Sequence, residues 1–230
     1  MLTTSAPAVS IDNLRYRYCS SDPDSQVLDS VSLDVYPGEL VILTGASGSG
    51  KTTLLTLIGG LRSGGSGQLN VLGVNLISAT PSDILHLRKC VGFIFQSHNL
   101  LPYLTASENI RVGLEIHEYW RHQGLSSMQE RCHELLHLLE LGSKAHFKPR
   151  NLSLGQKQRI SIARAISNNP HLILADEPTA SLDKDSAKIV VTLLKDLTNT
   201  MGTAVIVVTH DTKILDYADR IIRLDNGRVI

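Results

Sequence analysis

The sequence has few cysteines, no excess of either charge and no long apolar run. Its three cysteines, Cys19, Cys90 and Cys132, are odd in number, widely separated and outside any CxxC spacing, which indicates reduced thiols rather than a disulfide framework or a zinc site. The 22 Lys and Arg residues equal the 22 Asp and Glu residues, so the chain offers no basic field for nucleic acid and no polybasic tail for anionic lipid. We therefore expect a cytosolic protein that does not bind nucleic acid.

Membrane segments are also absent from the pattern. The first residues, MLTTSAPAVS, lack a basic start followed by an apolar core, and no later run approaches the roughly 20 apolar residues that a membrane span needs. With 42% hydrophobic residues over 230 positions, the chain can still bury a sizeable core as one domain. We expect any association with a membrane to occur through a partner.

A glycine-rich segment lies between a predicted strand, residues 41–44, and a predicted helix that begins at Thr53. The segment fits the pattern G-x-x-x-x-G-K-[ST], in which glycines let backbone N–H groups and the positive end of the helix approach a phosphate. Lys51 supplies a charge for the β- and γ-phosphates, and the Thr52 hydroxyl is the expected ligand of Mg²⁺. A glycine-rich turn without a ligand is the alternative, which the strand and helix on either side disfavour. The pattern predicts an ATP or GTP site made by Gly45, Ala46, Ser47, Gly48, Ser49, Gly50, Lys51, Thr52 and Thr53.

Three other predicted strands end in polar residues that suit nucleotide hydrolysis. Asp176 closes the apolar strand 172–176, at the edge where open α/β sheets bind ligands, and can hold Mg²⁺. Glu177 follows it and is a candidate base for an attacking water, with a solvated strand-end acid as the alternative. Gln96 ends the segment 91–96, which is predicted as a strand, and can sense metal and water. His210 ends the strand 204–210 and can bind the γ-phosphate. The last two are weak indications when taken singly.

The remaining pattern alternates strands and helices around this core. Residues 9–14 and 31–35 predict antiparallel strands with a loop at 20–26 between them, and residues 68–71 predict a further strand. Residues 53–61 and 184–201 predict helices against a sheet, and residues 106–141 predict an inserted helical lobe. The sequence thus predicts an α/β fold with a β edge in front and helices in the middle.

Six segments resemble, in their order along the chain, the motifs of the ATP-binding cassette family: GASGSGKT, Gln96, LSLGQ at residues 152–156, LILADE at 172–177, SLD at 181–183 and His210. They correspond to its Walker A, Q-loop, signature, Walker B, D-loop and switch histidine. The resemblance implies a P-loop NTPase (RecA-like) core with an antiparallel β subdomain, forming one nucleotide-binding domain over residues 1–230 with a helical signature subdomain inserted at about 100–165. It implies an ATPase whose catalytic residues are Glu177, His210, Gln96 and Lys51, and whose Mg²⁺ ligands are Thr52, Gln96 and Asp176.

The resemblance also implies that two copies pair head to tail around ATP. Ser153, Gly155 and Gln156 of one copy, with Asp183 of the D-loop, would then act on the nucleotide that the other copy holds. Leu154 departs from the family pattern, which has glycine there, and an N–H contact from Gly155 is the expectation that reconciles it with activity. Tyr18 matches the aromatic that stacks on adenine; Tyr16 lies on the same face of its strand, and we interpret it as a core residue.

Sequence segments such as GFIFQSHNLLPYLTASENI resemble those of the macrolide exporters and lipoprotein-releasing ATPases within that family, and most of all those of the DevA-type exporter ATPases. This implies a membrane permease of the MacB or DevC type, a periplasmic adaptor and an outer-membrane channel as partners, with the chain on the cytoplasmic side of the inner membrane. Residues 97–103 are the predicted permease contact, with packing inside the helical lobe as the alternative for any one of them. Two alternatives keep the same chemistry: an FtsE-like regulator of a membrane partner, and an importer ATPase.

Two histidine patterns resemble metal sites and are interpreted otherwise. HELLH at residues 133–137 fits the H-E-x-x-H pattern of zinc proteases, but its leucines fit a core-facing stripe and no third ligand is indicated. His117, Glu118 and His122 are expected to be solvated residues of a helix surface. Mg²⁺ is the one metal that the sequence leads us to expect.

Overall fold

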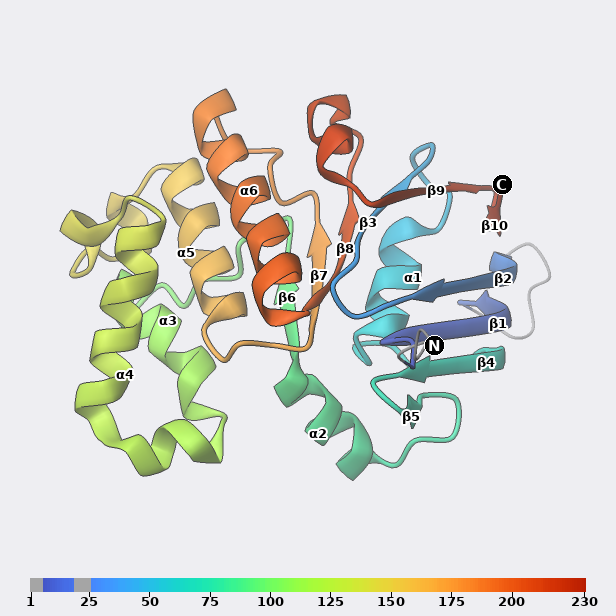
Figure 1. Ribbon diagram of the computed structural model, residues 1–230, viewed down its shortest axis with the longest axis horizontal. Helices are drawn as coiled ribbons and strands as arrows, with labels where there is room; N and C mark the ends of the chain where they lie inside the picture. Colours follow the sequence, from blue (N-terminus) through green and yellow to red (C-terminus); the bar gives the residue numbers. More distant parts are fainter. Residues whose placement is uncertain (1–5, 19–25) are drawn as a thin grey trace.

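The computed structural model describes residues 6–18 and 26–230, and it has two sheets with helices between and beside them (Figure 1). The strands are β1 (Val9–Arg17), β2 (Gln26–Val35), β3 (Leu40–Thr44), β4 (Ser66–Val71), β5 (Val74–Asn75), β6 (Val91–Ile94), β7 (Leu172–Asp176), β8 (Ala204–Val208), β9 (Arg220–Asp225) and β10 (Arg228–Val229). The α-helices are α1 (Lys51–Ile58), α2 (Pro81–Cys90), α3 (Ala106–Glu115), α4 (Glu118–Leu138), α5 (Leu154–Ile166) and α6 (Lys184–Met201). Short 3₁₀ helices occupy Gly142–Lys144, Pro149–Asn151 and Thr212–Tyr217.

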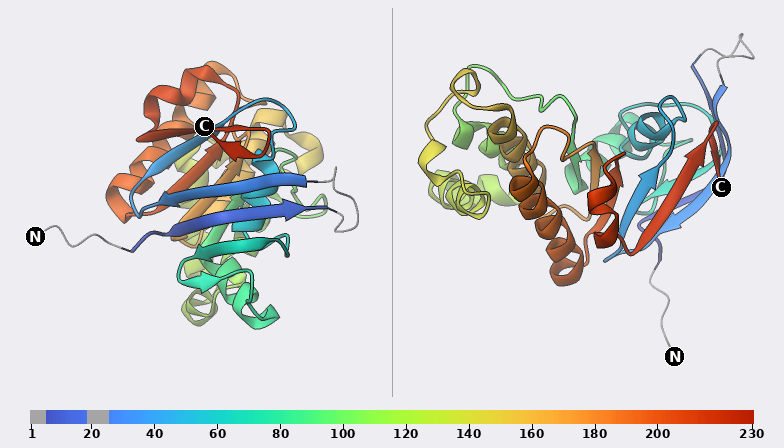
Figure 2. Two further views of the ribbon diagram at one scale, coloured as in Figure 1. Left: turned by 90° about the vertical axis from the view of Figure 1, so that its right-hand side faces the viewer. Right: turned by 90° about the horizontal axis from the view of Figure 1, so that it is seen from above.

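The two sheets differ in strand direction. The smaller one is antiparallel, with the order β2-β1-β4-β5. The larger one has the order β10-β9-β3-β8-β7-β6, in which β9, β3, β8, β7 and β6 run parallel and β10 returns antiparallel to β9. Figure 2 shows α1 between the two sheets, with α5 and α6 on the other side of the larger sheet. The predicted α/β fold with an antiparallel β region and a helical region is confirmed.

The central parallel strands β3, β7 and β8 are buried on both faces, because the side chains along them enter one of two cores. In β3, Leu40 and Ile42 pack with the helical side of the sheet, whereas Val41 and Leu43 pack with α1 and the antiparallel sheet. This alternation explains why these strands are continuous apolar runs in the sequence. Each fully buried aliphatic side chain contributes roughly 1.5–3 kcal/mol, so the two cores fix the sheet rigidly beneath its loops.

Several element boundaries differ from the sequence prediction. β1 and β2 extend beyond residues 9–14 and 31–35, and the predicted loop 20–26 lies outside the described residues except for Gln26, which opens β2. Helix α1 begins at Lys51 instead of Thr53 and ends at Ile58 instead of residue 61. It stops early because Gly59 caps it and Gly60 adopts a left-handed φ of 62°.

The helical region is broken where the sequence predicted a continuous pattern over residues 106–141. Helix α3 ends at Glu115, and His117 takes an extended conformation that starts α4. Within α4, Gly124 has φ 84° and ψ 174°, which kinks the helix. The domain limits proposed from the sequence, with an inserted subdomain at about residues 100–165, stay a prediction. Over residues 6–18 and 26–230, no helix has the length and apolarity that crossing a lipid bilayer requires.

Candidate functional site

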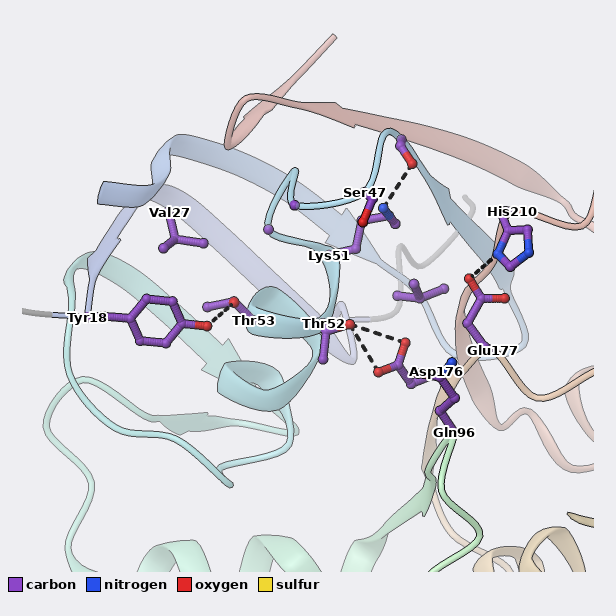
Figure 3. Close-up of a pocket in the computed structure, with 14 residues that line it drawn as sticks. Tyr18, Val27, Ser47, Lys51, Thr52, Thr53, Gln96, Asp176, Glu177 and His210 are labelled. Atoms are coloured by element: carbon purple, nitrogen blue, oxygen red, sulfur yellow. Dashed lines mark hydrogen bonds and ion pairs between the residues drawn. The ribbon is translucent and has the colours of Figure 1, made fainter. Parts of the chain in front are cut away.

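A cleft of about 520 Å³ lies where the parallel strands β3, β6, β7 and β8 reach their carboxyl ends (Figure 3). Because the strands are parallel, loops far apart in the sequence meet at this one edge. Twelve predicted site residues line the cleft together with two that were not predicted: Tyr18, Val27, Gly45, Ser47, Gly48, Gly50, Lys51, Thr52, Thr53, Gln96, Asp176, Glu177, Val208 and His210. The cleft has the volume of a nucleotide and is lined by both polar and apolar residues, so this edge of the sheet is the candidate site.

The phosphate loop joins β3 to α1 through glycines that no other residue can replace. Gly45 has φ 145°, and a Cβ there would lie 2.0 Å from the carbonyl oxygen of Leu224. Gly50 has φ 100°, and its Cβ would lie 2.9 Å from the carbonyl oxygen of Val27. Gly50 also caps α1 without a side-chain hydrogen bond, which leaves the first N–H groups of the helix for a ligand. The loop is therefore an anion cradle.

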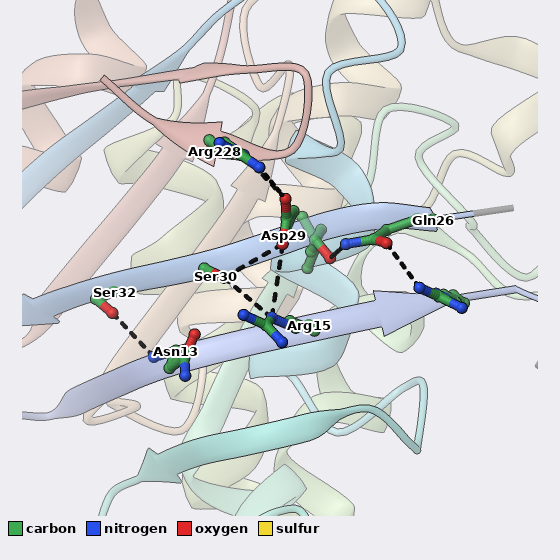
Figure 4. Close-up of polar contacts among 9 residues, drawn as sticks. Asn13, Arg15, Gln26, Asp29, Ser30, Ser32 and Arg228 are labelled. Atoms are coloured by element: carbon green, nitrogen blue, oxygen red, sulfur yellow. Dashed lines mark hydrogen bonds and ion pairs between the residues drawn. The ribbon is translucent and has the colours of Figure 1, made fainter. Parts of the chain in front are cut away.

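Two segments from outside the loop brace it. The N–H of Gly227, in the turn between β9 and β10, donates to the carbonyl of Ser49 at 3.1 Å, and the carbonyl of Gly227 accepts from the N–H of Asp29 at 2.8 Å. The Asp29 carboxylate in turn accepts from Nε of Arg228 at 2.9 Å and lies 3.6 Å from Nε of Arg15, as Figure 4 shows. The β9–β10 turn thus ties the phosphate loop to the antiparallel sheet.

Lys51 is folded onto the loop that carries it. Its Nζ donates to the carbonyl oxygens of Gly45 at 2.9 Å and Ala46 at 2.7 Å, and lies 3.4 Å from Oγ of Ser49. These acceptors are neutral, so a phosphate oxygen would be a stronger partner for the ammonium group. The side chain is held at the cradle in a position from which a phosphate can recruit it.

Asp176 and Thr52 form the oxygen-rich part of the cleft. The Thr52 hydroxyl donates to the Asp176 carboxylate, with Oγ1 3.0 Å from Oδ2 and 3.3 Å from Oδ1. Burial raises the pKa of Asp176, and the hydrogen bond from Thr52 offsets this only in part. Burial therefore disfavours the ionised form of this carboxylate, and Gln96 lines the same part of the cleft (Figure 3).

Glu177 is held in an unusual backbone conformation beside the cleft. Its φ of 48° is left-handed, which is costly for a residue with a Cβ, and its N–H donates to the carbonyl of Val208 at 2.9 Å. The carboxylate accepts from Nδ1 of His210 at 2.7 Å and from Oγ1 of Thr209 at 3.2 Å. The Glu177 side chain is 13% exposed and that of His210 is 77% exposed. The left-handed backbone of Glu177 places a partly exposed carboxylate in the cleft, with the imidazole of His210 on the solvent side.

The two tyrosines of β1 and its extension take different places. Tyr16 is 7% exposed within the core between the sheets, whereas Tyr18 is 57% exposed and lines the cleft. The rings meet edge to face with centroids 5.6 Å apart. The Tyr18 hydroxyl lies 2.8 Å from Oγ1 of Thr53, and the guanidinium of Arg62 lies 4.8 Å from its ring centroid. These positions agree with the sequence interpretation of both residues, while the stacking role of Tyr18 stays a prediction.

The predicted signature and D-loop residues lie outside this cleft. Ser153 is the N-cap of α5: its Oγ accepts from the N–H of Gln156 at 3.2 Å, and its own N–H donates to the Gln156 side chain at 3.0 Å. Gly155 packs against the D-loop, where a Cβ would lie 3.4 Å from the carbonyl oxygen of Ser181. Asp183 caps α6 by accepting from the N–H and hydroxyl of Ser186, each at 2.9 Å. Within one chain these residues do not reach the nucleotide cleft.

Two lining residues, Val27 and Val208, were missed by the sequence analysis. Val27 precedes the buried Leu28 in β2, so it is an apolar side chain on the outward face of a strand, and that break in alternation was the available signal. Val208 ends β8 just before His210, and nothing in its own pattern separates it from the other apolar residues of the strand. Both valines add apolar surface to the cleft.

The two histidine patterns that resemble metal sites lie on α4 and its N-cap, away from the cleft. His133 and His137 are exposed, and the ring of His137 lies against Gly142. Nε2 of His117 is 2.9 Å from the carbonyl oxygen of Lys89, and Glu118 and His122 are exposed. Within the described ranges, no group of three or more His, Cys, Asp or Glu side chains is arranged to hold a metal.

Known proteins share the sequence of nearly the whole chain. Residues 28–180 match the family model described as ABC transporter. The macrolide export ATP-binding/permease protein MacB of Pasteurella multocida is 42% identical over 97% of this chain, and that of Rhodospirillum rubrum is 40% identical over 100%. The chain spans 34% and 35% of the length of these two curated relatives, respectively, so the likeness concerns only part of each.

A solved structure shares the fold along the whole chain. The dimeric ATP-binding cassette MJ0796, in a post-hydrolysis state bound to ADP and phosphate, superposes with a TM-score of 0.87 at 35% identity and covers 96% of each chain. The antiparallel sheet, the parallel core with its phosphate loop and the helical region are thus those of a cassette that binds ATP. This chain belongs to the ABC transporter family.

Proposed function

We propose that the chain hydrolyses Mg²⁺-ATP as a head-to-tail dimer and powers a MacB-type membrane permease that exports or extracts an amphiphilic substrate. The observation that carries the proposal is the division of predicted site residues on one chain. Lys51, Asp176 and Glu177 line the cleft, whereas Ser153 and Gly155 lie outside it at the start of α5. A second copy can supply the missing half.

The donor set of the cleft fits Mg²⁺. Thr52 offers a hydroxyl, Asp176 a buried carboxylate and Gln96 an amide oxygen, and hard oxygen ligands are those that Mg²⁺ prefers. Burial raises the pKa of Asp176, so a cation there would favour its ionised form. When bound, the metal supplies charge neutralisation at the β- and γ-phosphate oxygens. We propose Thr52, Asp176 and Gln96 as the residues that hold it.

The chain's own groups supply the rest of the chemistry. The phosphate-loop N–H groups and the uncapped start of α1 bind the phosphates, and Lys51 exchanges its carbonyl partners for phosphate oxygens. Glu177 orients the attacking water and takes its proton at a carboxylate oxygen, while His210, 2.7 Å away, holds that carboxylate and then contacts the γ-phosphate. Tyr18 offers an exposed ring for adenine.

The start of α5 suits phosphate binding by a partner. Because Oγ of Ser153 accepts from the N–H of Gln156, its hydroxyl proton can donate to a ligand, and the neighbouring Gly155 is half-buried. The side chain of Leu154 is 63% exposed, which supports the view that it replaces glycine without blocking the contact from Gly155. The dimeric state of the cassette MJ0796 also supports pairing between copies. Asp183 then approaches the same interface from the D-loop.

Complementation between two inactive variants tests this arrangement. Lys51→Ala disables the phosphate loop, and Ser153→Arg disables the signature. If sites form between copies, a mixture of the two contains dimers with one site whose Lys51 and Ser153 are both intact, so ATP turnover returns. If each chain contains its whole site, the mixture is as inactive as either variant. Each variant alone, at the same total concentration, is the control.

A groove beside the cleft supports the permease as partner. It measures about 350 Å³ and is lined by apolar residues of β6, α3 and the loop between them, including Phe95, Leu101, Val112 and Ile116. Of the predicted contact, residues 97–103, only Leu101 lines the groove, and α3 contributes Val112 and Gly113, which the sequence analysis missed. The relatives named above are ATP-binding/permease proteins, so a short helix on the cytoplasmic side of such a permease is the occupant we propose. A periplasmic adaptor and an outer-membrane channel complete the proposed exporter.

Introducing a charged side chain into the groove tests the proposed docking surface. Ile116, which is 48% exposed, lines it, whereas Leu125, 63% exposed on α4, does not. We expect Ile116→Glu to abolish copurification with a MacB- or DevC-type permease and to leave ATP turnover of the isolated chain unchanged. Leu125→Glu is the matched control, and equal copurification of both variants contradicts the docking site.

A further inference from the structure

The loop that follows Gln96 has a strained backbone between the nucleotide cleft and helix α5. His98 and Asn99 are consecutive residues with left-handed φ angles of 56° and 49°. Residues with a Cβ rarely adopt this backbone conformation, and it persists where surrounding contacts enforce it. The contacts that hold this loop are therefore informative about what it does.

The imidazole of His98 spans two segments that are distant in sequence. Its Nδ1 lies 3.2 Å from the carbonyl oxygen of Gln96, and its Nε2 lies 3.0 Å from the carbonyl oxygen of Leu154. Both carbonyl oxygens are acceptors, and a neutral imidazole carries a single N–H, so the ring donates to one of them when neutral and to both only when it is protonated. One side chain thus connects the Q-loop residue of the cleft to the first helical residue of the signature motif.

Arg164 attaches the same loop farther along α5. Its guanidinium donates to the carbonyl of Asn99 at 2.8 Å and to that of His98 at 3.0 Å. Ten residues separate Leu154 from Arg164, which is about 15 Å along a helix, so the loop is held to α5 at two well-separated points. Arg164 also lines the apolar groove, whereas His98 is the attachment at the signature end.

We propose that His98 is a positioning residue that holds Gln96 and the signature motif of one chain as a single unit. This rests on the proposed function, in which Gln96 serves the nucleotide of its own chain and the signature serves that of the partner. A movement of Gln96 toward bound nucleotide is then transmitted through the imidazole to the start of α5. His98 in this way couples the two ATP sites of a dimer.

Substitution at His98 tests the coupling. We expect His98→Ala to lower kcat about ten-fold, as the loss of a bridging hydrogen bond predicts, with KM for ATP and the melting temperature little changed. His98→Gln, whose amide carries two N–H donors, is expected to restore most of kcat. His122→Ala, at an exposed imidazole of α4, is the matched control. A kcat of His98→Ala equal to that of wild type overturns the proposal, as does a loss that His98→Gln leaves uncorrected.

The complementation mixture shows whether the residue acts on both sites. His98→Ala is added either to the Ser153→Arg chain, where it faces Gln96 of the one intact site, or to the Lys51→Ala chain, where it faces the signature of that site. A coupling residue lowers the restored turnover in both placements, and an effect in one placement only overturns the proposal. If the mixture without His98→Ala has no turnover while wild type does, the proposed function fails instead.

Discussion

Replacing Glu177 by glutamine separates its catalytic role from its structural one. The glutamine side chain keeps the length of the original and can place its carbonyl oxygen toward Nδ1 of His210 and its NH₂ group toward the Thr209 hydroxyl, which can also accept. The contact with His210 that the carboxylate makes involves a side chain that is 77% exposed, so the free energy of unfolding should fall by less than about 1 kcal/mol. For a chain of 230 residues this lowers Tm by at most about 4 °C.

The effect on turnover is expected to be much larger. Loss of a general base lowers kcat by about 10²–10⁴, which corresponds to roughly 3–5 kcal/mol of the activation barrier. The Glu177→Gln protein should therefore bind Mg²⁺-ATP, accumulate as dimer and release little phosphate, whereas wild type cycles back to monomer. Phosphate release and light-scattering mass measure the two quantities on one sample.

Glu118→Gln is the matched control for charge, because Glu118 lies on the surface of α4 with its side chain 74% exposed. It should leave turnover and mass unchanged. A kcat for Glu177→Gln within ten-fold of wild type refutes the assignment of Glu177 as base. A fall in Tm well beyond 4 °C refutes the argument that the amide satisfies the same hydrogen-bond partners.

Burial and side-chain contacts lead to three further predictions. Burial raises the native pKa of Asp176 above its unfolded value, so the free energy of unfolding falls as pH rises through that interval, and the full destabilisation is present at pH 7. Asp176→Asn should therefore raise the Tm of the nucleotide-free protein at pH 7, with a smaller gain in acid. An unchanged Tm at pH 7 contradicts this. Tyr18→Ala should weaken ATP binding by about two- to ten-fold in equilibrium titration. Tyr18→Phe keeps the ring and loses only the contact with Thr53, so it should weaken binding by no more than about two-fold. Equal affinities of the two variants contradict stacking. Burial raises the pKa of Cys132 to about 11, so at pH 8 a thiol reagent should label the partly exposed Cys90 and spare Cys132. Peptide mass mapping detects the labelled positions, and equal labelling rates of the two cysteines contradict the prediction.

The order of elements could be predicted because its signals are local. Apolar runs such as residues 172–176 and 204–208 predict strands buried on both faces, and GASGSGKT predicts a strand, a tight loop and a helix within a dozen residues. Boundaries could not be predicted where a single glycine decides them, as at Gly60 and Gly124, because left-handed φ angles depend on the packing around the turn.

The candidate site divides in the same way. By itself, the sequence determined which residue types can bind phosphate, hold Mg²⁺ and activate water, because each lies at the end of a recognisable strand. Only the tertiary structure decided which of them share a cleft. The parallel strand order brings Gln96, Asp176, Glu177 and His210 to one edge of the sheet, whereas Ser153 lies outside the cleft at the start of α5. It also revealed the bridge from His98 to Leu154, since a hydrogen bond between segments 56 residues apart depends on how α5 packs beside β6, which local sequence does not encode.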